Sequence, residues 1–253
     1  MTLYFDLPRT TPVAADPTPW RDYRPSPRLV HTAVGSGLLT VLVAAAGGWS
    51  LLLGEGAAAV ACTIATLVLG HLSGLLLHLW VRPYNTGDRM RIAAAGDGSP
   101  GLTFRYSGRL YYWYGGFLGL LTIAQLGLAV TVWPFAAGAL LSGAALVMLS
   151  RHAPGRLTLT PDGVHHHGIR HQRFLPWESI SDILPGEQAH IPIIAAPTTG
   201  GQPHLTIQVP WLDTDPALVL QALRWYHANP VHRFELSYHI ACDRTRQRAW
   251  HLH

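Results

Sequence analysis

The chain has 253 residues, of which 49% are hydrophobic and 13% are charged, and its 18 basic residues only slightly outnumber its 14 acidic residues. The net charge of +4 is too small and too dispersed along the chain to favour a nucleic-acid partner. The two cysteines, Cys62 and Cys242, show no metal-type spacing, and no disulfide between them is expected.

Residues 1–28 are rich in Pro, Thr and Asp and show neither helical nor strand periodicity. Such a composition predicts a polar tail without a fold of its own. Four aromatic side chains interrupt the tail and are candidate anchors for a partner surface: Tyr4, Phe5, Trp20 and Tyr23. A passive tether is the alternative interpretation of the same residues.

Three stretches of the chain contain no Asp, Glu, Lys or Arg: residues 29–54, 56–81 and 110–150. About 20 apolar residues are enough for a helix to cross the roughly 30 Å hydrocarbon layer of a bilayer. The first two stretches each suffice for one helix, so we predict a transmembrane hairpin over residues 29–81. The third stretch is long enough for two helices with Trp133-Pro134 as the turn, so we predict a second hairpin over 110–150. Residues 82–109 are then a loop between the hairpins.

Arginines gather on one side of these predicted helices. They occur in the N-terminal tail, in the loop at 82–109 and after the fourth helix, whereas the two opposite turns hold only Glu55 and the uncharged Trp133-Pro134. Positively charged flanking segments stay in the cytoplasm. We therefore expect a multi-pass protein of the plasma membrane whose two termini, loop and C-terminal region are cytoplasmic.

Small residues recur at a spacing of four within the second and third predicted helices, as Gly70 with Gly74 and as Gly115 with Gly119. This spacing lets helix backbones approach closely. We interpret these glycines as helix-packing residues within the bundle, with a homo-oligomer or partner interface as the alternative. Gln125 in the third helix is expected to form a hydrogen bond to another helix.

Three histidines fall within the first two predicted helices: His31, His71 and His78. An ionisable residue in a membrane segment is a functional-site hypothesis by default. Paired imidazoles could ligate a haem or a metal or serve a proton relay, but no Asp or Glu lies within the helices to complete a relay. Only His31 and His78 are expected at the equal depth that haem ligation requires. We therefore expect no cofactor and no metal, and keep a haem- or metal-binding redox protein as the alternative function.

After residue 155 the pattern changes from long apolar runs to short strand-like segments. Residues 157–160 and 164–169 flank a turn at Pro161-Asp162-Gly163, and we interpret the histidines at 165–167 as exposed and solvated. A final helix begins with Asp215 as N-cap and Pro216 at its first position. We predict a small β-barrel capped by this helix over residues 156–230 and a tail at 231–253. The predicted fold class is an α+β membrane protein with four transmembrane helices.

The run Leu157-Thr158-Leu159-Thr160-Pro161-Asp162-Gly163-Val164, with Leu175-Pro176-Trp177-Glu178-Ser179-Ile180 after it, resembles the start of bacterial PH-like domains that are attached to membrane hairpins. In that family a strand, a turn of this type and a second strand precede such a Leu-Pro-Trp segment. The resemblance covers residues 102–230 and leaves the first hairpin and both tails unexplained. It implies a PH-like barrel that serves as an interaction module and carries no catalytic residues.

No sequence pattern for catalysis is present in a helix or strand setting that would support it, such as HExxH, a phosphate loop or paired carboxylates. We therefore predict a non-enzymatic membrane protein with a cytoplasmic interaction domain. Its expected role is that of an accessory or assembly subunit of a larger respiratory or envelope complex. The expected partners are the lipid bilayer and either other membrane proteins or further copies of the chain.

Overall fold

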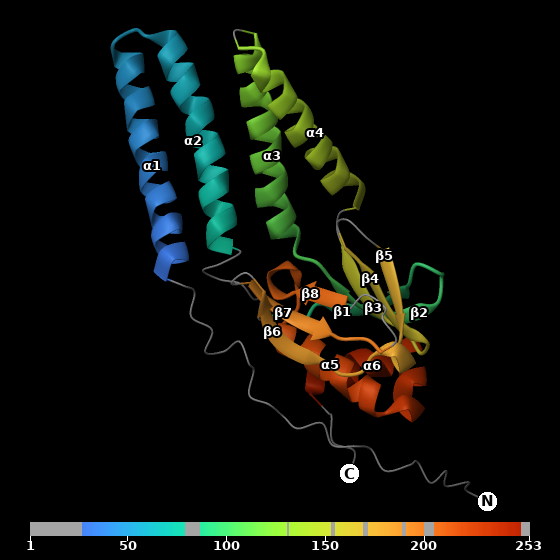
Figure 1. Cartoon of the computed structure of the whole chain (residues 1–253). Coiled ribbons are helices and arrows are strands. Elements are labelled where there is room, and N and C mark those ends of the chain that lie inside the picture. Colours follow the sequence, from blue (N-terminus) through green and yellow to red (C-terminus); the bar gives the residue numbers. More distant parts are fainter. Residues whose placement is uncertain are drawn as a thin grey trace, which may run out of the picture. The chain divides into compact units, whose positions relative to one another are not determined.

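The computed structural model describes residues 27–78, 87–130, 132–152, 155–168, 172–188, 191–199 and 205–248 (Figure 1). The chain forms two compact units, each assembled from separate stretches of sequence. The helical unit comprises Arg24–Pro83 and Ser107–Pro154. The sheet unit includes Tyr84–Tyr106 and Gly155–His253. The protein is thus a mixed helix and sheet structure.

The helical unit contains four long helices in two antiparallel hairpins: α1 (Pro27–Leu52), α2 (Gly56–Leu76), α3 (Gly108–Ala129) and α4 (Pro134–His152) (Figure 1). Gly54 turns the chain between α1 and α2 with φ +77°, a conformation that glycine adopts without steric cost. Within the described residues, three helices are long and apolar enough to cross a membrane, namely α1, α2 and α4. The fourth predicted span, α3, does not meet this measure of apolar character.

Each helical hairpin is held by a polar contact between its two helices. In the first, the Ser73 hydroxyl on α2 lies 3.0 Å from Ser36 Oγ and 3.4 Å from Thr40 Oγ1 on α1. In the second, Ser142 Oγ on α4 donates to Gln125 Oε1 on α3 at 2.9 Å. The predicted interhelical hydrogen bond of Gln125 is confirmed.

The sheet unit contains two antiparallel sheets. The five-stranded sheet has the order β1 (Met90–Ala94), β2 (Pro100–Arg105), β3 (Arg156–Leu159), β4 (Gly163–His167) and β5 (Gln172–Pro176). The three-stranded sheet has the order β6 (Leu184–Gln188), β7 (Ile191–Ala196) and β8 (Leu205–Gln208). Short 3₁₀ helices, η2 (Trp177–Ser179) and η3 (Val209–Trp211), follow β5 and β8.

The whole α3–α4 hairpin is inserted between two neighbouring strands of the five-stranded sheet. β2 leads into α3, α4 leads into β3, and β2 and β3 pair from Leu102↔Leu159 to Arg105↔Arg156. We call the end of the sheet with Arg105 and Arg156 the junction end. The other end, with the β3–β4 turn after Leu159, is the distal end.

The domain boundaries differ from those predicted. Residues 82–109 were expected to be a loop, but β1 and β2 lie there and add two strands to the sheet. Residues 231–253 were expected to be a tail, but η4 (Pro230–Ser237) and α6 (His239–Gln247) pack on the sheet unit and fully bury Leu236, Ala241 and Thr245. Both stretches mix apolar with charged residues, so which of their side chains are buried depends on tertiary contacts.

The predicted closed barrel is wrong for the described part of the chain, because the two sheets stay separate. Only the isolated bridges Asp88↔Thr214, Tyr106↔Leu212 and Ile180↔Thr198 supplement the two ladders. Pro176 and Pro210 lie where β5 and β8 give way to 3₁₀ helices, and proline cannot donate to a ladder. The sheets therefore end at these corners instead of continuing into each other.

The predicted C-terminal helix is present as α5 (Pro216–Ala228). Asp215 is its N-cap and accepts a hydrogen bond from Ala217 N at 2.9 Å, and Pro216 begins the helix. Most of α5 is buried, and the helix contributes Trp225 and Tyr226 to the core of the sheet unit. Trp177 also lies in this core, where its indole nitrogen donates to Thr160 O at 2.9 Å.

Candidate functional site

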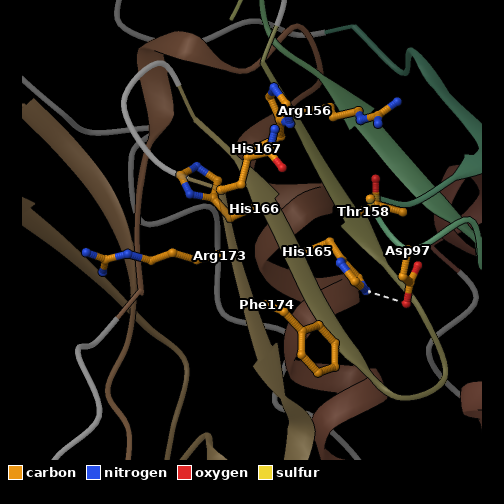
Figure 2. Close-up of a pocket in the computed structure, with 10 residues that line it drawn as sticks. Asp97, Arg156, Thr158, His165, His166, His167, Arg173 and Phe174 are labelled. Carbon is orange, nitrogen blue, oxygen red and sulfur yellow. Dashed lines mark ion pairs between the residues drawn. The ribbon is translucent and has the colours of Figure 1, made fainter.

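A hollow of about 250 Å³ lies against the five-stranded sheet (Figure 2). Its lining comes from the β1–β2 turn and from β3, β4 and β5: Gly96, Asp97, Arg156, Thr158, His165, His166, His167, Gln172, Arg173 and Phe174. Successive side chains of a strand alternate between the two faces of a sheet. The register rows Thr158–His165–Phe174 and Arg156–His167–Gln172 therefore share one face, which we call the outer face. The opposite face carries the buried row Leu159–Val164–Leu175.

The floor of the outer face is polar although it is buried. Thr103 on β2 and Thr158 on β3 are cross-strand partners, each only 1% exposed, and their hydroxyl oxygens are 3.0 Å apart. This hydrogen bond satisfies both hydroxyls inside the sheet. The pair fixes β2 against β3 beneath the hollow.

The β1–β2 turn brings a carboxylate over the outer face. Asp97 Oδ1 accepts hydrogen bonds from Ser99 N at 3.0 Å and from Ser99 Oγ at 2.6 Å, and these bonds hold the pKa of Asp97 below its usual value. Asp97 Oδ2 lies 3.4 Å from His165 Nε2 (Figure 2). Burial lowers the pKa of His165, although Asp97 acts in the opposite direction. At neutral pH an ionised carboxylate therefore faces a neutral imidazole.

The three consecutive histidines of β4 are half-buried rather than exposed as predicted. His165 and His167 lie on the outer face, and the His165 ring packs on Phe174 with centroids 4.5 Å apart. His166 points to the opposite face and forms a hydrogen bond with the Tyr106 hydroxyl. Burial lowers the pKa of His166 to about 4, with Arg173 and His167 as further causes. The prediction that these histidines are exposed was wrong because it did not consider the side chains of the neighbouring strands, which cover them.

The four predicted packing glycines all lie against side chains of their own chain. A Cβ added to Gly70 would lie 3.7 Å from Thr40 Cγ2 on α1, and one added to Gly74 would lie 2.5 Å from Trp113 Cε3 on α3. Gly115 and Gly119 face Leu149 and Leu146 on α4 at 3.6 and 3.8 Å. The sequence analysis missed Gly116, whose added Cβ would lie 2.5 Å from His71 Cδ2.

His71 takes part in the contact between α2 and α3. Its Nδ1 donates to Leu67 O at 2.9 Å, and its ring lies 5.4 Å from the Trp113 ring and 5.8 Å from the Tyr112 ring. Gly116 sits against the other ring nitrogen, Nε2, which is the one that a metal would need. The geometry of His71 therefore fits helix packing.

His31 on α1 is exposed, and His78 is half-buried just beyond α2. In the part of the chain that the structure describes, no hydrogen bond or ring contact joins any two of His31, His71 and His78. The described residues also contain no group of three or more His, Cys, Asp and Glu side chains that could hold a metal. The candidate anchors Tyr4, Phe5, Trp20 and Tyr23 lie outside the described residues.

A second surface feature lies on η4 and α6, in the stretch that was expected to be a tail. Val231, Phe234, Tyr238 and Ile240 are exposed by 48%, 56%, 62% and 52% within ten residues of sequence. We call these four side chains the distal patch. The neighbouring Arg233 donates to Glu178 at 2.9 Å, and its guanidinium lies 5.2 Å from the centroid of the Trp177 ring. Because Trp177 binds Thr160 in the β3–β4 turn, η4 lies at the distal end of the sheet.

A buried ionic cluster holds η4 and α6 together beneath the distal patch. Glu235 accepts hydrogen bonds from Arg244 Nε at 2.8 Å, and its Oε1 lies 3.0 Å from His232 Nδ1. Arg244 also lies over the Trp225 ring, 4.5 Å from its centroid. The three charged or polar side chains are each 10% exposed or less, so losing one would leave an uncompensated buried group.

No family model, curated protein or solved structure matches the chain. Its function is therefore argued from its own residues.

Replacing Gly74 or Gly116 by Ala should destabilise the helical unit by about 1–3 kcal/mol, because the added Cβ meets the Trp113 or His71 ring. The measurement is the thermal unfolding midpoint in detergent. Gly48→Ala is the matched control, since a Cβ there meets nothing within 4 Å. An equal midpoint for Gly74→Ala and Gly48→Ala would show that α2 and α3 do not pack through Gly74.

The stability of the sheet unit should fall as the pH is lowered from about 6.5 to 4. In this range an unfolded histidine takes up a proton that folded His166 does not bind, because its pKa is lowered to about 4. Thermal unfolding across this range should show a shallower dependence on pH for His166→Gln than for the wild type. His239→Gln, at an exposed position, should keep the wild-type slope, and equal slopes for all three proteins would contradict the burial of His166.

Proposed function

We propose that the chain is a non-enzymatic, four-helix protein of the plasma membrane whose cytoplasmic sheet unit docks another membrane protein. In this role it is an accessory or assembly subunit of a larger complex. The observation that carries the proposal is the distal patch, four large apolar side chains that are about half exposed or more within ten residues of sequence.

The insertion of the α3–α4 hairpin into the sheet supports four crossings rather than three. Arg105 and Arg156 are register partners, so the chain leaves and re-enters the sheet at the same place. If α4 crosses the bilayer, α3 must cross it as well. Its 22 residues span about 33 Å at 1.5 Å per residue, which covers the hydrocarbon layer. Arg109 and the aromatic residues at 111–114 lower its apolar character, as expected for the segment at a cytoplasmic interface.

The orientation rests on the arginines. They flank the ends of the helices on the side of the sheet unit and are missing from the turns at Glu55 and Trp133. Positively charged flanks place the sheet unit and both termini in the cytoplasm. The sheet unit is then available to cytoplasmic parts of neighbouring membrane proteins.

A protein is the occupant that best fits the distal patch. Phenylalanine and tyrosine are typical of the buried centres of protein interfaces, and contiguous exposed apolar side chains mark interaction sites. The patch lies at the distal end of the sheet, whereas the strands join the membrane helices at the junction end. The nearby arginines are already neutralised, as Arg233 by Glu178 and Arg246 by Asp88 at 3.1 Å. An uncharged apolar face of a partner therefore complements this surface.

The resemblance to bacterial PH-like domains agrees with this role. Two antiparallel sheets followed by α5, with Trp177 of the Leu-Pro-Trp segment in the core, support such a domain. Domains of that family are interaction modules. Here the domain would begin at β1, before the start of the resemblance at residue 102, and would include η4 and α6.

The double substitution Phe234→Ser with Tyr238→Ser should remove the partner. Tagged full-length protein extracted from its native membranes in gentle detergent should carry a stoichiometric membrane protein, and the double variant should lose at least nine-tenths of it. Both side chains are more than half exposed, so the thermal unfolding midpoint of the variant should stay close to that of the wild type, as is usual for surface substitutions.

Phe174→Ser is the matched control, because Phe174 is 46% exposed but lies on the outer face of β5 and is not part of the distal patch. This variant should retain the partner. Retention of the same partner at the same stoichiometry by the Phe234 and Tyr238 variant would overturn the proposed docking surface.

A further inference from the structure

The junction end of the five-stranded sheet carries two arginines without a negative partner. Arg105 and Arg156 are direct cross-strand partners, so their Cβ atoms lie about 4.5–5.5 Å apart on the same face. In the described part of the chain, neither guanidinium makes a hydrogen bond or an ion pair. His167 and Gln172 complete this row and bring no negative charge. Like charges placed directly opposite each other destabilise a sheet, so a bound anion would stabilise this row.

A negative charge lies one register row further along the same face. Two residues along a strand separate the row of Arg156 from the row of Thr158 and His165, a distance of about 7 Å. Asp97 reaches over this second row from the β1–β2 turn. Its Oδ1 is occupied by Ser99, whereas Oδ2 faces only the neutral His165 ring and forms no hydrogen bond with it. This oxygen is open to a cationic donor.

We propose that the hollow on the outer face binds a phosphoethanolamine group. Its phosphate lies against Arg105 and Arg156, and its ammonium lies against Asp97 Oδ2. Two methylene groups join the phosphate to the ammonium, a span that matches one register row. The aromatic wall formed by Phe174 and His165 flanks these methylenes. A half-open space of about 250 Å³ accommodates the group.

The membrane is the nearest source of this group. Arg156 follows the end of α4, His152, by four residues, and this segment spans at most about 14 Å. A lipid headgroup is therefore the first source to test if α4 crosses a bilayer. A phosphatidylethanolamine headgroup and free phosphoethanolamine share the recognised chemistry, and the experiment separates them.

The test uses the full chain, purified in detergent and stripped of lipid. Calorimetric titrations compare short-chain phosphatidylethanolamine, phosphatidylcholine and phosphatidylglycerol with free phosphoethanolamine. The wild type should bind phosphatidylethanolamine about tenfold more tightly than the other two lipids, since choline cannot donate a hydrogen bond to Asp97 and glycerol carries no charge. Comparable binding of free phosphoethanolamine assigns the site to a soluble ligand, and binding of the lipid alone assigns it to a headgroup.

Three substitutions locate the site. Arg156→Gln, with Arg105→Gln as a second variant in case the first is unstable, should weaken phosphatidylethanolamine binding about tenfold. Asp97→Asn should abolish the preference for ethanolamine over choline while leaving phosphatidylglycerol binding unchanged. Arg246→Gln is the control, because Arg246 lies on α6, pairs with Asp88 at 3.1 Å and is not among the residues that line the hollow. Equal binding of all three lipids by the wild type, or wild-type selectivity in Asp97→Asn, would overturn the proposal.

Discussion

The pairing of β2 with β3 is the interaction on which both units depend. These strands are neighbours in the sheet, yet the whole α3–α4 hairpin lies between them in the chain. Their register places Leu102 opposite Leu159 and Phe104 opposite Leu157, and all four side chains are fully buried. The entropy of closing so long a connection is lowered if α3 and α4 have first formed their own hairpin. The pairing of β2 with β3 therefore closes a shorter effective loop once α3 and α4 are paired.

This pairing also organises the surfaces of the sheet unit. Arg105 and Arg156 lie at the junction end, the hollow extends from Arg156 to Asp97 in the β1–β2 turn, and the exposed apolar side chains lie on η4 and the start of α6. The arginine row and the distal patch therefore lie on different elements of the sheet unit. A lipid headgroup at one end and a protein at the other are compatible occupants of the same domain.

The long helices of the helical unit could be predicted from the sequence, but the sheet unit could be predicted only in part. The uninterrupted apolar runs predicted the long helices, because burial in lipid needs no particular neighbour. Asp215 and Pro216 predicted the start of α5, because a helix cap is a local interaction. The strand β1 and the helix α6 were not predicted, because β1 is only partly buried and the burial of Ala241 and Thr245 on α6 depends on tertiary contacts.

The candidate sites show the same division. Gly74 was predicted to pack, but its neighbour Trp113 and the contact of Gly116 with His71 depend on how α2 meets α3. The row formed by Arg105 and Arg156 could not be predicted for a related reason. Arg105 appeared to belong to a loop and Arg156 to a strand, and only the register of β2 and β3 makes them neighbours.

The most direct test of this account is a cysteine pair at positions 103 and 158. The threonine hydroxyls there are 3.0 Å apart across β2 and β3. Thr103→Cys and Thr158→Cys would be introduced into a full-length chain whose Cys62 and Cys242 are replaced by Ala, and membranes would be oxidised and digested. If β2 pairs with β3 as described, mass spectrometry should detect a disulfide-linked peptide that joins the two positions. Alkylation of both thiols without any linked peptide would contradict the pairing of β2 with β3.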